Sequence, residues 1–157
     1  MQTRRDMLSH STKVALMLAA AGLVPSMSLA QAAAGDYNKA AFEAKTIADL
    51  MKALGAAAPV ESKDVTITGP DIAENGAVVP IGAATTLPGA KRMLLLVEKN
   101  PSVLSAMFDV NDSIEANFST RVKMGQSSDV YAVAMMNDGK VLFAKKEVKV
   151  TLGGCGG

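Results

Sequence analysis

The chain has one cysteine, Cys155, and it lies in the terminal pentapeptide Gly-Gly-Cys-Gly-Gly, residues 153–157. A thiol can act as a nucleophile, bind a soft metal ion, form a disulfide or hold a covalent adduct. Cysteine prefers burial, and an exposed free thiol reacts readily in an oxidising compartment. This position therefore calls for a chemical reason, although glycine-rich termini are also flexible by default and can hold a cysteine by accident.

The glycines around the thiol favour a carrier of covalent cargo over a catalytic residue. Four of them flank it: Gly153, Gly154, Gly156 and Gly157. Without neighbouring Cβ atoms the backbone adopts φ of either sign and fits a narrow channel. We expect Leu152 to be the last anchored residue. The three residues from there to Cys155 span about 10 Å when extended, which is the reach of the thiol-bearing residue. A catalytic thiol needs a fixed position and a base or cation that lowers its pKa from about 8.5. We therefore predict a flexible arm over 153–157 and no catalytic residue.

The first 30 residues have the features of an export signal. A basic start is followed by an apolar run from Val14 to Val24 and by Ser28-Leu29-Ala30, a small-x-small cleavage pattern. The apolar run is only about ten residues and ends at Pro25, so it is too short to cross a bilayer core of roughly 30 Å. We expect a soluble mature protein without a stable membrane anchor.

The arginine pair in this signal indicates the export route. The stretch Thr3 to Leu8, which contains Arg4-Arg5, resembles a twin-arginine signal, although Met7 stands where an aromatic residue is usual. A chance arginine pair in an ordinary secretion signal is the alternative. The sequence thus predicts a periplasmic protein that crosses the membrane already folded.

Removal of residues 1–30 changes the chemical inventory. Lys plus Arg falls from 16 to 13 and Asp plus Glu from 15 to 14, so the formal net charge becomes 13 − 14 = −1. Such a near-neutral chain gives no reason to expect nucleic acid or an anionic membrane as a partner. The only histidine, His10, is lost, which excludes a Ser-His or Cys-His pair and a histidine metal site within the mature chain. We expect no metal or cofactor. A lone cysteine stays free, pairs with another molecule or carries a modification.

The remaining 157 − 30 = 127 residues suffice for one domain, which we place at 31–152. A single helix is predicted between a cap at Asn38 and a stop at Gly55. Its apolar face consists of Phe42, Ile47, Leu50, Met51 and Leu54.

Short apolar runs separated by turn residues follow Pro59, a pattern typical of antiparallel strands. The expected strands lie within 65–68, 77–86, 91–99, 103–110, 116–122, 130–136 and 141–151. Asn137-Asp138-Gly139 predicts a hairpin, because Asp-Gly tolerates the positive φ of such turns. The fold class is therefore all-β, an immunoglobulin-like antiparallel β-sandwich with one N-terminal helix; the strand order is not predicted.

Three short motifs have both a structural and a functional interpretation. The run Met93 to Val97 is apolar on both faces, which predicts a central strand; we favour cover by the chain's own core, and cover by another chain is the alternative. Met135-Met136 could suit a cuprous ion, but adjacent strand residues face opposite sides, so we favour core packing. Lys145, Lys146 and Lys149 are interpreted as a solvated strand face; guiding an anionic ligand or partner is the alternative.

The end of the chain resembles a known family. The terminal pentapeptide, preceded by Glu147 to Thr151, is similar to the end of SoxY, the sulfur-carrier subunit of the periplasmic thiosulfate-oxidising Sox system. Three interior segments extend the resemblance over most of the mature chain: Pro70 to Gly76 with Val79-Pro80, Glu98 to Pro101, and Thr120 to Met124.

The resemblance implies a fold, partners and a role for Cys155. SoxY-like proteins have an immunoglobulin-like sandwich and pair with a SoxZ-like subunit, which would cover apolar strand surface such as Met93 to Val97. The cysteine that matches Cys155 is coupled oxidatively to thiosulfate by the haem enzyme SoxAX. SoxB then hydrolyses the terminal sulfonate as sulfate, and SoxCD oxidises the remaining sulfane sulfur where that enzyme is present. For Asn75, Gly76 and Pro80 we favour a turn beside an edge strand; a docking surface for partner enzymes is the alternative.

Two functions of other classes compete with the carrier. A chain that ends in Gly-Gly can be a sulfur carrier whose Gly157 carboxylate becomes a thiocarboxylate, but that activation consumes ATP, which the periplasm lacks. An exported structural or adhesive sandwich domain could instead use Cys155 for an intermolecular disulfide.

Overall fold

The structure, a computed structural model, describes residues 38–152. Two short helices begin this part of the chain. They are α2 (Lys39–Glu43) and α3 (Ile47–Ala53), so the prediction of a single helix was wrong. The chain becomes extended at Ala44, with φ −61° and ψ 130°, and Thr46 then caps the second helix by accepting a hydrogen bond from the backbone N–H of Asp49. The apolar spacing continues across this break, which concealed it in the sequence.

The two ends of this helical segment agree with the prediction. Asn38 caps α2, because its side-chain oxygen accepts a hydrogen bond from the backbone N–H of Ala41 at 3.0 Å. Gly55 follows α3 with a positive φ of 61°, the left-handed conformation that ends many helices. The buried side chains of Leu50 and Met51 pack on the sheet below.

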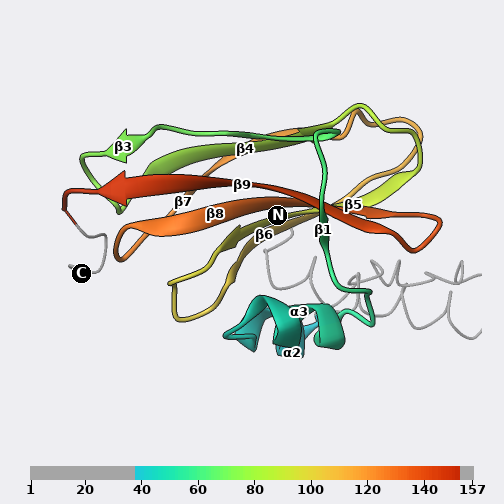
Figure 1. Cartoon of the computed structure of the whole chain (residues 1–157), viewed down its shortest axis with the longest axis horizontal. Coiled ribbons are helices and arrows are strands. Elements are labelled where there is room, and N and C mark those ends of the chain that lie inside the picture. Colours follow the sequence, from blue (N-terminus) through green and yellow to red (C-terminus); the bar gives the residue numbers. More distant parts are fainter. Residues whose placement is uncertain (1–37, 153–157) are drawn as a thin grey trace, which may run out of the picture. The chain divides into compact units, whose positions relative to one another are not determined.

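Nine strands follow, and they form two sheets that pack face to face (Figure 1). Their bounds are β1 (Val60–Glu61), β2 (Val65–Thr68), β3 (Ile72–Ala73), β4 (Val79–Thr85), β5 (Ala90–Val97), β6 (Leu104–Asp109), β7 (Asn117–Val122), β8 (Ser128–Met136) and β9 (Val141–Val150). The larger sheet has the order β1-β9-β8-β5-β6, with β3 also paired to β9, and the smaller one has the order β2-β4-β7. The predicted antiparallel β-sandwich of the all-β class is confirmed.

The two shortest strands are the ones that the sequence did not indicate. Both β1 and β3 contain only two residues, and both pair with β9 in parallel. A run of two residues is too short for an alternating pattern, so only the tertiary structure shows them. The seven longer strands lie where they were predicted.

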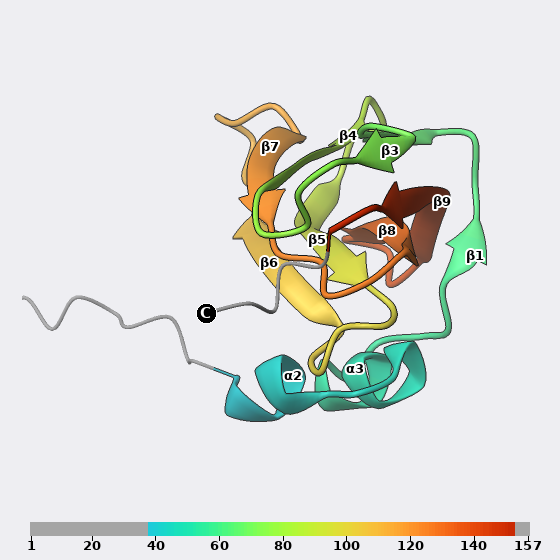
Figure 2. The same ribbon diagram turned by 90° about the vertical axis from the view of Figure 1, so that its left-hand side faces the viewer.

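Strand β5 is central and buried on both faces. Its residues Met93, Leu95 and Val97 belong to the core between the two sheets. The alternate residues Leu94 and Leu96 face the helices and pack with Leu50, so residues 38–152 form three layers (Figure 2). All five side chains of the run have 0% relative exposure within this one chain. The favoured interpretation, cover by the chain's own core, is therefore confirmed. Helices α2 and α3 cover the outer face, so the cover by a SoxZ-like subunit that the resemblance implied for this run is wrong.

The methionine pair and the predicted hairpin are confirmed. Met136 lies in the core between the sheets, whereas Met135 lies in the core under the helices, one on each face of β8. The turn between β8 and β9 has Gly139 at a φ of 86°. Lys140 donates its backbone N–H to the Asp138 carboxylate at 3.0 Å, which fixes this turn.

Candidate arm-bearing site

Strand β9 leads the chain to Leu152, the last residue that the structure describes, and three consecutive residues at this end are held by hydrogen bonds. The Val150 N–H donates to Ser127 Oγ at 2.9 Å. The Thr151 N–H donates to the Ala73 carbonyl at 3.1 Å, and the Leu152 carbonyl accepts from the Gly76 N–H at 2.8 Å. We call Val150 to Leu152 the arm base. The prediction that Leu152 is anchored is confirmed.

The segment from Asp71 to Gly76 runs beside the end of β9 and supplies most of these partners. The Lys149 N–H donates to the Asp71 carbonyl at 2.9 Å, and Thr151 Oγ1 donates to the Glu74 carbonyl at 3.0 Å. Asn75 then reverses the chain, because its side-chain oxygen accepts from the Ala77 N–H at 2.8 Å. The segment thus forms a parallel ladder against β9 that ends in a turn.

This geometry decides part of the question about Asn75, Gly76 and Pro80. Asn75 and Gly76 form the predicted turn, and Gly76 is buried with both of its backbone groups in use: its N–H binds Leu152 and its carbonyl accepts from Met124 at 2.7 Å. Pro80 is exposed within β4, beyond the end of β2, whose last residue lies opposite Gly82. The signal for the turn was the Asn-Gly pair, but its contact with the arm base could not be predicted from it.

The Asn100-Pro101 turn, which follows β5 in the larger sheet, joins the same structure through residues 123–125, which follow β7 in the smaller sheet. Asn100 Nδ2 donates to the Lys123 carbonyl at 2.7 Å, and Asn100 Oδ1 accepts from the Gly125 N–H at 3.3 Å. Met124, between these two residues, donates to Gly76. A continuous set of hydrogen bonds therefore links the Asn-Pro turn, through residues 123–125, to Gly76 and the arm base.

Two serines complete the support: Ser127, the last residue of the β7 to β8 connection, and Ser128, the first residue of β8. Ser127 accepts from the arm base, as described, while buried Ser128 accepts from the Lys99 N–H at 3.1 Å and donates to the Asp129 carbonyl at 2.9 Å. The interior segments that carried the family resemblance thus meet at one end of the sandwich, the end at which β9 stops (Figures 1 and 2). Strand pairing places them there, although they are far apart in sequence.

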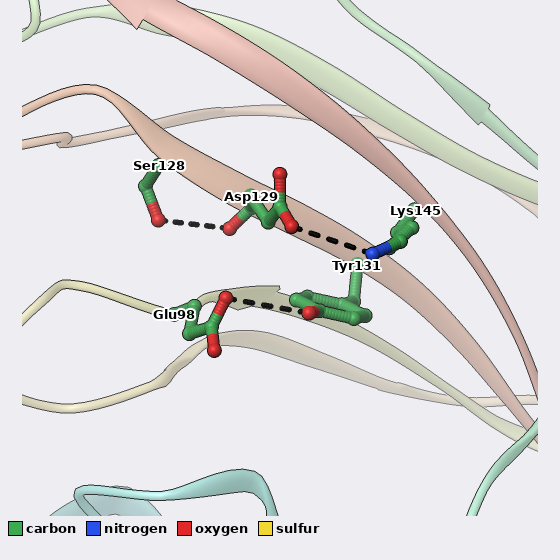
Figure 3. Close-up of polar contacts among 5 residues, drawn as sticks. All are labelled: Glu98, Ser128, Asp129, Tyr131 and Lys145. Carbon is green, nitrogen blue, oxygen red and sulfur yellow. Dashed lines mark hydrogen bonds and ion pairs between the residues drawn. The ribbon is translucent and has the colours of Figure 1, made fainter.

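Polar side chains on the outer face of β8 and β9 lie near this end (Figure 3). Tyr131 donates its hydroxyl to Glu98 Oε2 at 3.3 Å, and Asp129 Oδ2 lies 3.6 Å from Lys145 Nζ. Burial of the phenol, with the negative charge of Glu98 beside it, raises the pKa of Tyr131 to about 12. At neutral pH this tyrosine is therefore a hydrogen-bond donor and not a base.

The predicted solvated face of Lys145, Lys146 and Lys149 is only partly correct, because Lys146 makes contacts within the chain. Lys146 Nζ donates to the Gly69 carbonyl at 2.7 Å and lies 2.8 Å from Asp71 Oδ1. The hydrogen bond and the positive charge of Lys146 lower the pKa of Asp71. Lys146 thereby fastens the start of the Asp71 to Gly76 segment to β9, whereas Lys149 is exposed as predicted.

Two other cations face solvent at the arm-bearing end. Arg121 and Lys123 are exposed and line a groove of about 320 Å³ beside Asn100 and Ser105. These two side chains give the groove a positive charge, while exposed Glu74 and Glu98 lie in the neighbouring connections.

The described residues 38–152 contain no group of three or more His, Cys, Asp or Glu side chains that could hold a metal ion. Within the same range, no helix is both long and apolar enough to cross a membrane. Cys155 and the four glycines around it lie outside the described residues, as does the export signal. Their roles therefore remain predictions.

Comparison with known proteins identifies the family. The model of the family described as "Sulfur oxidation protein SoxY" matches residues 50–155. The chain belongs to the SoxY family. The match begins inside α3 and extends to Cys155, so it includes the arm base and the segments that support it.

A solved SoxY structure has the same fold. The sulfur carrier protein SoxY from Chlorobium limicola f thiosulfatophilum is 35% identical in sequence, and the match covers 68% of this chain and 97% of that chain with a TM-score of 0.61. A superoxide reductase (neelaredoxin) from Ignicoccus hospitalis is 18% identical, with 55% of this chain and 79% of that chain covered and a TM-score of 0.49, which is too distant to indicate function. No curated protein sequence matches the chain significantly.

Proposed function

We propose that this SoxY family member is a periplasmic covalent sulfur carrier, in which Cys155 holds thiosulfate-derived sulfur while partner enzymes act on it. One observation supports the proposal most directly. The segments that resemble the family are joined by hydrogen bonds to the arm base, immediately before the residues that carry the thiol. A carrier needs a rigid base for its arm, and the sandwich provides one at this end.

The chemistry that we propose for Cys155 is electron-balanced. Loading joins the cysteine thiolate to the sulfane sulfur of thiosulfate, giving Cys–S–S–SO₃⁻ and releasing two electrons to a haem enzyme of the SoxAX type. Hydrolysis by a SoxB-type enzyme adds one water to the terminal sulfonate, releasing sulfate and two protons and leaving Cys–S–S⁻. A SoxCD-type enzyme can oxidise the remaining sulfane sulfur. The carrier contributes only the thiol and its position.

The domain organisation and location belong to the same proposal. Residues 1–30 direct export by the twin-arginine route, residues 31–152 form the sandwich, and residues 153–157 form the carrier arm. A SoxZ-like subunit would pair with a surface other than Met93 to Val97, since the chain's own helices and second sheet cover that run.

Intact mass spectrometry of the exported protein tests this function. After exposure to thiosulfate and the loading enzyme, we expect a mass increase that a reductant removes and that the Cys155→Ser variant does not acquire. Fragmentation locates the added sulfur. Sulfur on the Gly157 carboxylate would support the thiocarboxylate carrier instead, and a permanent disulfide-linked homodimer without any adduct would support the structural alternative.

A further inference from the structure

The last residues of β9 are held differently from the rest of the strand. The pairing between β8 and β9 ends at Ser128 opposite Val148, so Val150 lies beyond the β8 ladder. Val150 is half-buried and packs against the core between the sheets, but burial does not hold the next two residues, because Thr151 is exposed and the Leu152 side chain is 66% exposed. Beyond the packing of Val150, the arm base is held by hydrogen bonds, and side-chain hydroxyls make two of them.

These two hydroxyls act from opposite sides of the strand end. Ser127 Oγ accepts the Val150 N–H at 2.9 Å, taking over where the β8 ladder has stopped. Thr151 Oγ1 donates to the Glu74 carbonyl at 3.0 Å, on the side of β3. The Lys149 and Thr151 N–H groups bind the Asp71 and Ala73 carbonyls of the same flanking segment. The strand end is therefore clamped between the β7 to β8 connection and the Asp71 to Gly76 segment.

We propose that Ser127 and Thr151 are positioning residues that set where the carrier arm begins, and hence how far and in which direction Cys155 can reach. The inference rests on the proposed carrier function and goes beyond it: the hydrogen bonds of two hydroxyls determine the length of the arm. Each residue released from the clamp adds about 3.3–3.6 Å of possible reach. It also adds backbone freedom that must be lost again when the thiol enters an active site.

Removal of both hydroxyls tests the clamp. The variant Ser127→Ala/Thr151→Val retains similar side-chain volumes, whereas Ser127→Thr/Thr151→Ser retains both hydroxyls. Ser62→Ala is the matched control, because Ser62 Oγ also accepts a backbone N–H, from Asp64 at 3.1 Å, in the connection between β1 and β2. Thermal unfolding of all three variants checks that the sandwich remains folded.

Two measurements on the whole chain report the arm directly. Amide hydrogen exchange at Val150 and Thr151 should accelerate about tenfold or more in the double alanine–valine variant, as expected when an ordered residue is released. A spin label on Cys155, with a second on Asp112→Cys, gives the spread of distances from the body to the arm. That spread should widen in the same variant and stay unchanged in the Ser–Thr exchange and in Ser62→Ala.

Enzyme kinetics separates positioning from general damage. In this assay the concentration of the loaded carrier is varied and the SoxB-type enzyme hydrolyses it. The KM for the Ser127→Ala/Thr151→Val carrier should be about tenfold higher than for the unmodified carrier, because roughly one more backbone residue must be ordered on binding. The kcat should stay within about twofold, because the chemistry after entry is the same. Unchanged exchange, distances and KM would overturn the clamp while leaving the carrier intact. Absence of any adduct on the unmodified chain would instead overturn the carrier function itself.

Discussion

Replacing Leu94 by alanine should destabilise the isolated chain strongly, because the chain's own helices cover this side chain. Leu94 has 0% relative exposure and packs with Leu50 and Leu96 under α2 and α3. The change removes three methylene-sized groups, which is about 2.4 kcal/mol at about 0.8 kcal/mol each. The cavity left behind adds to this transfer term, so we expect a total loss of about 3–5 kcal/mol in the free energy of unfolding.

Urea unfolding of the purified chain without a partner subunit measures this loss. Leu152→Ala is the matched control, since the same chemical change at a side chain that is 66% exposed should cost less than about 0.5 kcal/mol. The reasoning is refuted if Leu94→Ala unfolds like the unmodified chain and loses stability only when a partner subunit is added. That result would mean that Met93 to Val97 is completed by another chain and not by the helices.

Three further predictions concern the arm and the polar face. Cys155→Ser should leave the unfolding transition unchanged but abolish thiosulfate-dependent sulfate production, and a normal rate in this variant would contradict the carrier function. Gly154→Val retains the thiol but adds a branched side chain beside it, so the adduct should still form while turnover by partner enzymes slows; unaffected turnover would remove the steric part of the argument. The pKa of Tyr131 is raised from 10.0 to about 12, so the folded state binds the phenol proton more tightly than the unfolded state does. The contribution of Tyr131 to the free energy of unfolding should therefore be complete below pH 10 and fall as the pH rises toward about 12. Tyr131→Phe should remove that fall. Tyr37→Phe leaves Tyr131 as the one tyrosine of the chain, and ultraviolet titration of this variant should place the tyrosinate transition near pH 12 and not near pH 10.

Local patterns predicted the elements whose cause is local. The turn at Asp138-Gly139 needs a positive φ, and Gly139 adopts one. Asn38 caps the first helix through its own side chain. The alternation in Asn117–Val122 and the apolar run in Met93 to Val97 likewise fixed strand positions, because side-chain burial has a period of two in a strand.

Elements whose cause is tertiary could not be predicted in this way. The double burial of Met93 to Val97 is visible in the sequence, but nothing in the run tells whether a helix or a partner subunit covers it. The break at Ala44 interrupts a regular apolar spacing and is stabilised by the cap at Thr46. The strands β1 and β3 exist because β9 offers them an edge, which is a property of the assembled sheet.

The direction of each strand determines which connections lie at the end of the sandwich where β9 stops. The alternation of strands and turns in the sequence contained this information. Consecutive strands from β4 to β9 run alternately toward and away from the end at which β9 stops. The antiparallel pairs β5·β6, β5·β8 and β8·β9 set this in the larger sheet. The antiparallel pair β4·β7, with Gly76 and Met124 beside Leu152, sets it in the smaller one. The connections before β4, between β5 and β6, and between β7 and β8 must then share that end with the arm base. These are the connections that contain Asn75, Asn100 and Ser127. Counting strands in an alternating order would therefore have grouped the three segments around the C-terminal strand, whereas only the structure could show that their amides, carbonyls and hydroxyls join to hold Gly76 and Leu152 together.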